Sequence, residues 1–327
     1  MGSAFVVIVN YRTAPMVVDC LASLAAEAAA LRGGKAVVVD NASADGSASM
    51  IHEAIVANGW QGWAEAFEMP ENGGFAYGTN AGIARAREID PTLFAIVVLN
   101  PDTLVRPGAI STLVAFLHAN SRIGIAGASI ERPGGAVEIS AHRDPSPLGE
   151  LDSAARLGLI SRWLGRRVIS GSEPRQCDWV SGACMAVRRE TLDAAGPFDE
   201  GFFLYFEEVD FCARARRLGW TCWYVPGARV VHYEGASTGI RVPRRRRPAY
   251  WFDSRRRFFV KRYGIRGLLA ADLLWAIGRL SLVLRRLLGL GGRAGAGEEP
   301  ERLSRDLLIG DMRALITGTL RRIPRDA

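Results

Sequence analysis

The sequence of 327 residues has only five cysteines, and none of them forms a C-x-x-C pair. A zinc site built from such pairs is therefore not expected, and the odd number suits a reducing, cytoplasmic compartment. No G-x-G-x-x-G follows the first apolar run, which disfavours a dinucleotide-binding site, and the absence of G-x-x-x-x-G-K-[ST] excludes a P-loop NTPase. No basic stretch precedes the first apolar run, so we expect no signal peptide.

Lysine is also scarce, and nearly all basic side chains are Arg. Charge is unevenly distributed along the chain. Residues 1–240 carry a net charge of −6 and residues 241–327 a net charge of +13, which gives +7 for the whole. The length suits roughly two domains at ~150 residues each. We expect a folded α/β domain over 1–240 and a basic helical extension over 241–327, whose charge favours an anionic partner.

Short β-branched runs alternate with Ala- and Leu-rich segments through the first hundred residues. This rhythm indicates an α/β fold with a Rossmann-like, mostly parallel central sheet flanked by helices. The strands are predicted at 5–9, 36–39, 64–68 and 93–99. Two further strands are predicted near 221–225 and 229–232, after a weakly periodic stretch of loops and short helices.

Three of the first four strands end in polar side chains. Asn10-Tyr11 follows the first strand, Asp40-Asn41 the second, and Asn100-Pro101-Asp102 the fourth. In open parallel sheets, ligands bind beyond the carboxyl ends of the strands. The sequence therefore predicts a ligand site at this edge of the sheet.

Several short motifs follow one another in a fixed order between residues 5 and 235, and together they resemble the inverting family 2 glycosyltransferases of the GT-A fold. The likeness is greatest to the bacterial rhamnosyltransferase-like branch. The motifs are Val6-Val7-Ile8-Val9-Asn10-Tyr11, Val39-Asp40-Asn41-Ala42-Ser43, Asn72-x-Gly74-Phe75-Ala76-x-Gly78-x-Asn80, Leu99-Asn100-Pro101-Asp102, Gly182-Ala183, Gly196-x-Phe198-Asp199-Glu200, Glu207-Glu208-x-Asp210 and His232.

The resemblance implies a nucleotide-binding half over about 1–105 and an acceptor half over about 106–240. It also implies transfer of a sugar from a pyrimidine nucleotide donor, either dTDP-rhamnose or a UDP-sugar. The acceptor would be a glycan or a polyprenyl-diphosphate-linked sugar in cell-surface polysaccharide synthesis.

The resemblance assigns the nucleotide to the ends of the first strands. Asp40 would accept the N3–H of uracil or thymine, Tyr11 would lie against the ring, and Asn10 belongs to the same strand end. Asn80 would help to hold the nucleotide, and Asn100 and Asp102 are assigned to nucleotide binding as well. The other interpretation of Asp40 is a helix or turn cap.

A divalent cation, Mg²⁺ or Mn²⁺, would neutralise the departing diphosphate. Asp102 matches the last residue of the family's metal-binding D-x-D motif, and Asn100 stands where the first acid usually is. Asp102 would therefore be the one anionic ligand of the motif. His232 matches a family histidine that completes the metal or diphosphate site.

Inverting transfer needs a carboxylate that takes the proton of the acceptor hydroxyl. Glu207, Glu208 and Asp210 are close together, and mutual repulsion raises at least one pKa in such a group. Asp210 and Arg214 stand four residues apart, which predicts a structural ion pair on a helix. The resemblance puts the base at Glu208, with Glu207 as the alternative.

The acceptor is assigned to a segment that precedes the acids. Gly182-Ala183 would let the backbone approach donor or acceptor closely. Trp179 would either stack on an acceptor sugar or lie in the core.

The basic extension contains the runs Arg244–Arg247 and Arg255–Arg257, for which a solvated face is the leading interpretation. Residues 265–290 predict an amphipathic helix on which Asp272, Arg279 and Arg286 share one face. This helix is too charged to span a bilayer and would lie on an anionic membrane surface or pack on the catalytic domain. We expect a peripheral protein on the inner face of the cell membrane. A last helix is predicted at about 301–320.

Two other functional classes compete with a sugar transferase. A nucleotidylyltransferase or another nucleotide-binding α/β enzyme would share the strand-end polar residues but would lack an acid doublet followed by a distant histidine. A nucleic-acid-binding protein is suggested only by the Arg runs, and no aromatic-interleaved RNA motif accompanies them, so no nucleic-acid partner is expected. The sequence leaves the oligomeric state open.

Overall fold

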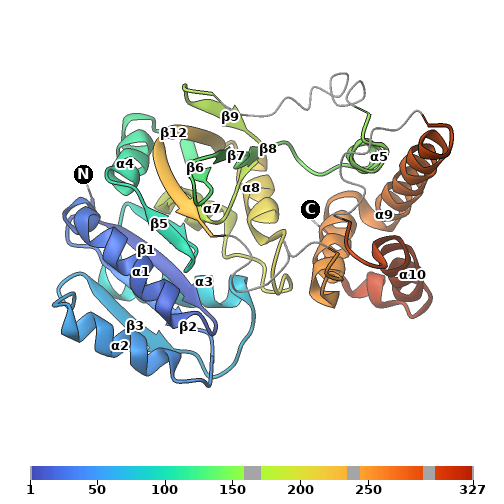
Figure 1. Ribbon diagram of the computed structural model, residues 1–327. Helices are drawn as coiled ribbons and strands as arrows, with labels where there is room; N and C mark the ends of the chain where they lie inside the picture. The colour runs from blue at the N-terminus through green and yellow to red at the C-terminus, as the bar shows by residue number, and fades with distance from the viewer. Residues whose placement is uncertain (1, 158–170, 234–243, 290–298, 326–327) are drawn as a thin grey trace. The chain divides into compact units, whose positions relative to one another are not determined.

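The computed structural model describes residues 2–157, 171–233, 244–289 and 299–325 (Figure 1). The chain forms two compact units, each considered by itself below. The first unit comprises Met1–Arg143, Val168–Phe203 and Glu207–Thr238, and the second comprises Asp144–Arg167, Leu204–Phe206 and Gly239–Ala327. Compact packing does not show that a unit folds alone, so the sequence boundary at residue 240 stays a prediction.

A ten-stranded sheet organises the first unit, in the order β3-β2-β1-β4-β11-β6-β12-β5, with β7 on β6 and β9 on β12. Its strands are β1 (Ala4–Asn10), β2 (Ala36–Asp40), β3 (Ala64–Glu68), β4 (Ala95–Leu99), β5 (Thr103–Val105), β6 (Ile123–Glu131), β7 (Val137–Glu138), β9 (Arg175–Cys177), β11 (Cys184–Arg188) and β12 (Thr221–His232). β8 (Ala141–His142) and β10 (Trp179–Val180) form a separate pair.

Six strands of this sheet run in one direction, namely β3, β2, β1, β4, β6 and β12, because β11 is antiparallel to both β4 and β6. The predicted α/β class with a mostly parallel sheet is therefore confirmed. The four strands predicted in the first hundred residues are present with ends shifted by two residues at most. The two strands predicted after residue 220 form one strand, β12, whose register is irregular between Val225 and Arg229.

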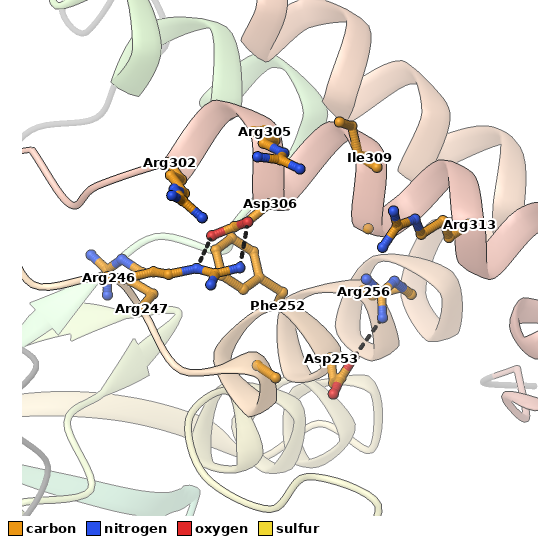
Figure 2. A pocket seen from close by; sticks show the side chains of 12 residues that line it. Arg246, Arg247, Phe252, Asp253, Arg256, Arg302, Arg305, Asp306, Ile309 and Arg313 are labelled. Atoms are coloured by element: carbon orange, nitrogen blue, oxygen red, sulfur yellow. Dashed lines mark hydrogen bonds and ion pairs between the residues drawn. The ribbon is translucent and has the colours of Figure 1, made fainter.

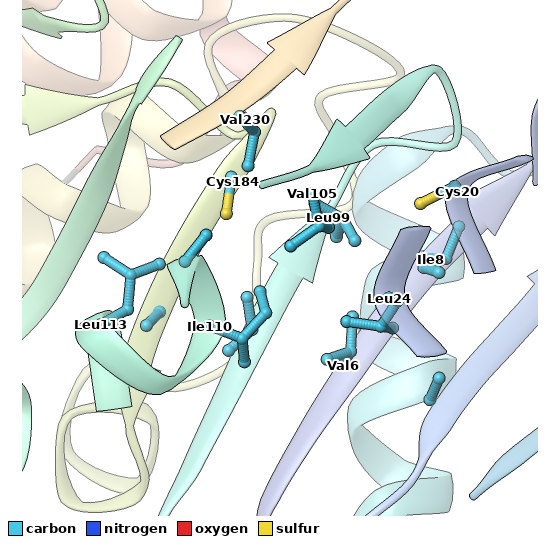
Figure 3. Close-up of a cluster of buried hydrophobic side chains, with 14 of the residues drawn as sticks. Val6, Ile8, Cys20, Leu24, Leu99, Val105, Ile110, Leu113, Cys184 and Val230 are labelled. Carbon is cyan, nitrogen blue, oxygen red and sulfur yellow. The ribbon is translucent and has the colours of Figure 1, made fainter. Parts of the chain in front are cut away.

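Helices cover both faces of the sheet because successive side chains of its buried strands point to opposite sides. In β1, Val6 and Ile8 join the cluster under one helical layer, whereas Phe5 and Val7 join the cluster under the other. Figure 3 shows part of the first cluster. Its layer contains α1 (Ala14–Leu24), η1 (Ala25–Leu31), α2 (Ser47–Ala57) and α4 (Ala109–Ala119), and the opposite layer contains α3 (Phe75–Ile89), α7 (Arg189–Ala195) and α8 (Glu207–Arg217).

The second unit is helical. It contains α5 (Pro147–Ala155), α9 (Ala249–Leu287), α10 (Leu303–Ile316) and the short η2 (Thr319–Arg322). A small apolar core joins its three α-helices through Ala154, Phe252, Trp275 and Leu307. The backbone of α9 breaks at Gly264, where φ is 71°. The helix predicted from residue 265 is therefore the second half of a longer element whose first half carries the Arg255–Arg257 run.

The second Arg run is not a solvated face. Arg255 is 2% exposed, and Arg256 is also buried. The Arg255 guanidinium donates to Asp272 at 2.9 Å, to Asp311 at 3.1 Å and to Glu150 at 3.0 Å. The expectation of solvation is thus wrong for these two residues, because carboxylates from three helices compensate the buried cation. Burial raises the pKa of Asp272 to about 7 despite its contact with Arg255.

The amphipathic helix predicted over 265–290 presents its apolar side to solvent. Asp272 is turned into the unit, whereas the exposed side chains recur at helical spacing and are mostly Leu: Leu269, Leu273, Ile277, Leu280, Leu284 and Leu287. By length and composition alone, Ala249–Leu287 and Ala14–Leu31 would each be long and apolar enough to cross a membrane. Buried core helices pass the same test, and much of α1 lies in the core.

Candidate active site

The first two strands end side by side, with Asn10 opposite Asp40 in the parallel register. The Asn10 amide donates to Asp40 Oδ1 at 2.5 Å, and the Ser43 hydroxyl donates to the same oxygen at 2.6 Å. Asp40 Oδ2 accepts the backbone N–H of Ser43 at 3.0 Å. The structure therefore gives Asp40 the turn-capping role that the sequence offered as its other interpretation, and a contact with a nucleotide base stays a prediction.

Asp40 is buried but is also among the residues that line a cavity. This cavity of about 350 Å³ has walls that come from β2, β3 and α2, including His52 and Phe67. Tyr11, one residue beyond β1, is 39% exposed, and the Arg12 guanidinium lies 5.0 Å from the centre of its ring. An exposed ring at the end of a parallel strand is available to stack on a nucleotide base.

The end of β4 meets the end of β12 at three predicted residues. His232 Nε2 lies 3.1 Å from Asp102 Oδ1 and 3.3 Å from the side-chain nitrogen of Asn100. Pairing of β12 with β5 produces this contact, since His232 stands opposite Thr103 in the antiparallel register. Asp102 and His232 are both buried, so the carboxylate and the imidazole are shielded from water.

The acid doublet opens α8. Glu207 is buried and Glu208 half-buried, and the Oε2 atom of each is buried without a hydrogen-bond partner among the described residues. Burial raises the pKa of Glu208 to about 7. The pKa of Glu207 is raised well above its usual value, first by burial and then by the charge of Glu208. The repulsion predicted from the sequence contributes to the raised pKa of Glu207, and burial is the larger cause.

Gly182 and Ala183 lie between these two clusters. A Cβ on Gly182 would lie 3.8 Å from the Cβ of Glu208, and the Ala183 carbonyl accepts the backbone N–H of Asn100 at 2.9 Å. The pair thus links the acid doublet to the end of β4. A Cβ on Gly182 would meet only ordinary van der Waals contacts, so the protein's own packing does not require glycine there. The close approach of this backbone to a substrate stays a prediction.

Trp179 lies on β10, where its ring stacks on His142 at 4.2 Å between centroids. The indole nitrogen donates to the Arg143 carbonyl at 3.0 Å. The ring is half-buried, and a role in acceptor binding stays a prediction.

Asn80 holds the loop that precedes the acid doublet. The Asn80 amide donates to the Phe198 carbonyl and to Glu200 Oε1 at 2.9 and 2.8 Å, and its oxygen accepts the Phe198 N–H at 2.9 Å. These bonds occupy the side chain, so a nucleotide contact by Asn80 stays a prediction. The expected ion pair between Asp210 and Arg214 is present at 2.9 Å.

Sequence reasoning assigned no role to two residues that shape the site. Ser43 holds the Asp40 carboxylate through its backbone N–H and its hydroxyl, and Asp and Ser are both residue types that favour turns. Gly74 has a φ of 93°, and its Cβ position would collide with the backbone of Phe203, so only glycine fits there. No local signal predicts the contact between Gly74 and Phe203, because these residues are far apart in sequence.

The family of the chain follows from residues 3–250, which match the family described as glycosyltransferase like family 2. The chain belongs to this family. Its predicted membership and its class as a glycosyltransferase are thereby confirmed, and the nucleotidylyltransferase alternative is set aside.

This glycosyltransferase is 34% identical over 247 residues to N-acetylglucosaminyl-diphospho-decaprenol L-rhamnosyltransferase of Mycobacterium tuberculosis. The match covers 72% of this chain and 77% of that relative. A shorter match, 28% identical over 146 residues, is to the low-salt glycan biosynthesis hexosyltransferase Agl10 of Haloferax volcanii, and covers 45% of this chain and 44% of Agl10.

Solved structures support the GT-A fold of the glycosyltransferase. A mannosyltransferase from Pyrobaculum calidifontis, in complex with GDP-Man and Mn²⁺, has a TM-score of 0.54 at 15% identity and covers 98% of this chain and 82% of its own. GalNAc-T7, with UDP, GalNAc and Mn²⁺, has a TM-score of 0.55 at 15% identity and covers 97% of this chain and 58% of its own. At this identity the likeness concerns the fold alone.

Proposed function

We propose that the chain is an inverting glycosyltransferase that moves a sugar from a pyrimidine nucleotide diphosphate, dTDP-rhamnose or a UDP-sugar, to a polyprenyl-diphosphate-linked acceptor. The observation that carries the proposal is the half-buried Glu208. Its carboxylate has an unpartnered oxygen among the described residues, and its pKa is raised to about 7. A base poised near neutral pH beside the Gly182 backbone suits the removal of a proton from a sugar hydroxyl.

In the proposed reaction, the acceptor oxygen attacks the anomeric carbon from the face opposite the nucleotide. The C–O bond to the acceptor forms as the bond to the diphosphate oxygen breaks, and the hydroxyl proton passes to Glu208. Glu207 keeps a raised pKa beside it, so the doublet favours a form with a single negative charge. Asn10, Asp40 and Tyr11 form the strand ends at which we place the nucleotide base.

We place the diphosphate of the donor next to a cation held by Asp102 and His232. A carboxylate oxygen and an imidazole nitrogen 3.1 Å apart suit a divalent cation, Mg²⁺ or Mn²⁺, that takes its other ligands from substrate oxygens. No cluster of three or more such ligands occurs among the described residues, which agrees with a site that only substrate completes. A bound cation would supply charge neutralisation for the leaving diphosphate.

The proposed acceptor rests on the M. tuberculosis relative, whose name gives a decaprenol-linked substrate. A lipid-linked acceptor would bring the protein to the inner face of the cell membrane. The exposed leucine side of α9 and the net charge of +13 on residues 241–327 support that location.

The test is to compare the wild-type protein with Glu208→Gln on a panel of sugar nucleotides and a short-chain prenyl-diphosphate acceptor. Removal of the base should lower transfer by about 10²–10⁴-fold, while thermal stabilisation by dTDP or UDP is kept. Glu190→Gln, an exposed position on α7, is the matched control and should keep full turnover. Near-full turnover of Glu208→Gln would refute the base assignment.

A further inference from the structure

An arginine-rich cavity of about 590 Å³ lies within the second unit, where the start of α9 faces α10 (Figure 2). Six arginines line it: Arg246, Arg247, Arg256, Arg302, Arg305 and Arg313. Among the described residues, the acids in the lining are Asp253 and Asp306, so the formal charge of this lining is +4, from six cations and two anions. The volume is within the usual range for small-molecule sites.

Two of these arginines already have carboxylate partners. Arg246 binds Asp306 through two hydrogen bonds of 2.6 and 2.8 Å, and Arg256 binds Asp311 at 2.7 Å and Asp253 at 2.6 Å. These ion pairs hold the walls of the cavity in place, and both acids of the lining take part in them. The charge that remains belongs to the other four arginines.

Those four have no such compensation. The side chains of Arg302, Arg305 and Arg313 make no hydrogen bond or ion pair to any residue that the structure describes, although the charges of Arg302 and Arg305 help to lower the pKa of Asp306. Arg247 stacks on Trp251 at 4.4 Å, and its Nε is buried with no acceptor among the described residues. Burial lowers its pKa, which is the effect of desolvating a cation. Such a site favours a ligand with more than one negative charge.

The chemistry of the side chains selects phosphate. Guanidinium groups stay charged and match phosphate oxygens with paired N–H donors. Apolar side chains adjoin the cationic lining on α10: Ile309 is in the wall, and Met312 and Ile316 are exposed at helical spacing from it. A soluble phosphate compound would leave this apolar strip in water, whereas a lipid would cover it.

We propose that this cavity binds the doubly charged phosphate head group of a membrane lipid, whose hydrocarbon chain lies along Ile309, Met312 and Ile316. The inference deepens the membrane location proposed above and rests on it. It adds a specific head-group site to a location that so far depends on general charge and apolar surface.

The test measures binding of the full chain to vesicles by flotation. Phosphatidylcholine vesicles carry phosphatidic acid, a phosphomonoester, or phosphatidylglycerol, a phosphodiester, in amounts adjusted to the same surface potential. A head-group site should bind the phosphatidic acid vesicles at least tenfold more tightly. Arg305→Gln with Arg313→Gln should abolish this preference, whereas the exposed pair Arg321→Gln with Arg322→Gln, which removes the same charge outside the cavity lining, should keep it.

A further variant separates lipid from soluble phosphate. Met312→Gln should weaken vesicle binding severalfold and leave the affinity for free inorganic diphosphate unchanged. Equal losses in the two arginine pairs, or no preference at matched surface potential, would show a diffuse basic surface and overturn the site. If free diphosphate binds as tightly as the vesicles do, the proposal that the ligand is a lipid is wrong. Nucleotide binding by each variant tests the catalytic proposal separately.

Discussion

His232 Nε2 lies 3.1 Å from Asp102 Oδ1, although 130 residues separate the two in the chain. The contact depends on β12, which ends at His232 and pairs with β5 directly after Asp102. Because both side chains are buried, loss of the Asp102 carboxylate changes the charge of a site that water screens poorly. Their joint role can be examined without measuring turnover.

We predict that Asp102→Asn removes the metal dependence of nucleotide binding. Without its carboxylate, the site has no anionic ligand left in the motif, so Mn²⁺ should no longer increase the thermal stabilisation given by dTDP or UDP. Thermal shift with each nucleotide, with and without Mn²⁺, measures this effect. Asp193→Asn, an exposed position on α7, serves as control. An undiminished response to Mn²⁺ in Asp102→Asn would remove this residue from the proposed metal site.

The rate of transfer should depend on pH through the acid doublet. Burial raises the pKa of Glu208 to about 7, and the base works only as a carboxylate. We therefore expect kcat/KM to rise about tenfold per pH unit below about pH 7 and to level off above it. Because Glu207 is coupled to Glu208, the midpoint belongs to the pair. A rate independent of pH between 5.5 and 8 would count against a carboxyl base with a raised pKa.

The same burial should make the ionised Glu208 side chain lower the free energy of unfolding. Its pKa is raised from 4.5 to about 7, so the folded state binds more protons than the unfolded state between these values. The contribution of Glu208 to the free energy of unfolding should therefore fall as pH rises from about 4.5 to about 7. At pH 8, Glu208→Gln should melt at least about 2 °C above the wild type.

Toward pH 5 that advantage should shrink, because the folded wild type is then protonated at Glu208. Differential scanning calorimetry at pH 5 and pH 8 measures both differences. A variant that is less stable than the wild type at pH 8 would show that the carboxylate has a stabilising partner.

The buried cation of the second unit should matter for stability. Arg255→Met leaves Glu150 and Asp272 without this counter-ion and leaves Asp311 with Arg256 alone, and breaking a buried pair of this kind costs about 3–5 kcal/mol. Arg266→Gln, on the same helix but exposed, should change the free energy of unfolding by less than about 0.5 kcal/mol. Denaturant unfolding followed by tryptophan fluorescence compares them. Equal and small changes in the free energy of unfolding of the two variants would show that Arg255 is solvated, as the sequence predicts.

The fold class and much of the candidate site could be predicted from the sequence because they depend on local patterns. The apolar runs before Asn10, Asp40 and Asn100 specify strands, and their order along the chain specifies parallel neighbours in the first half of the sheet. The acid doublet at Glu207 and Glu208 is visible as residue types in a row. The helix predicted from residue 265 begins beside the break at Gly264.

Tertiary structure alone decided what depends on partners far apart in sequence. β11 enters antiparallel between β4 and β6, and this brings the Ala183 carbonyl to Asn100. Whether Asp40 is used as a turn cap, and how strongly burial raises the pKa of Glu208, depend on the atoms packed around them. Arg255 is buried for the same reason: its carboxylate partners stand 17, 56 and 105 residues away, so the sequence around the Arg run contains no sign of them.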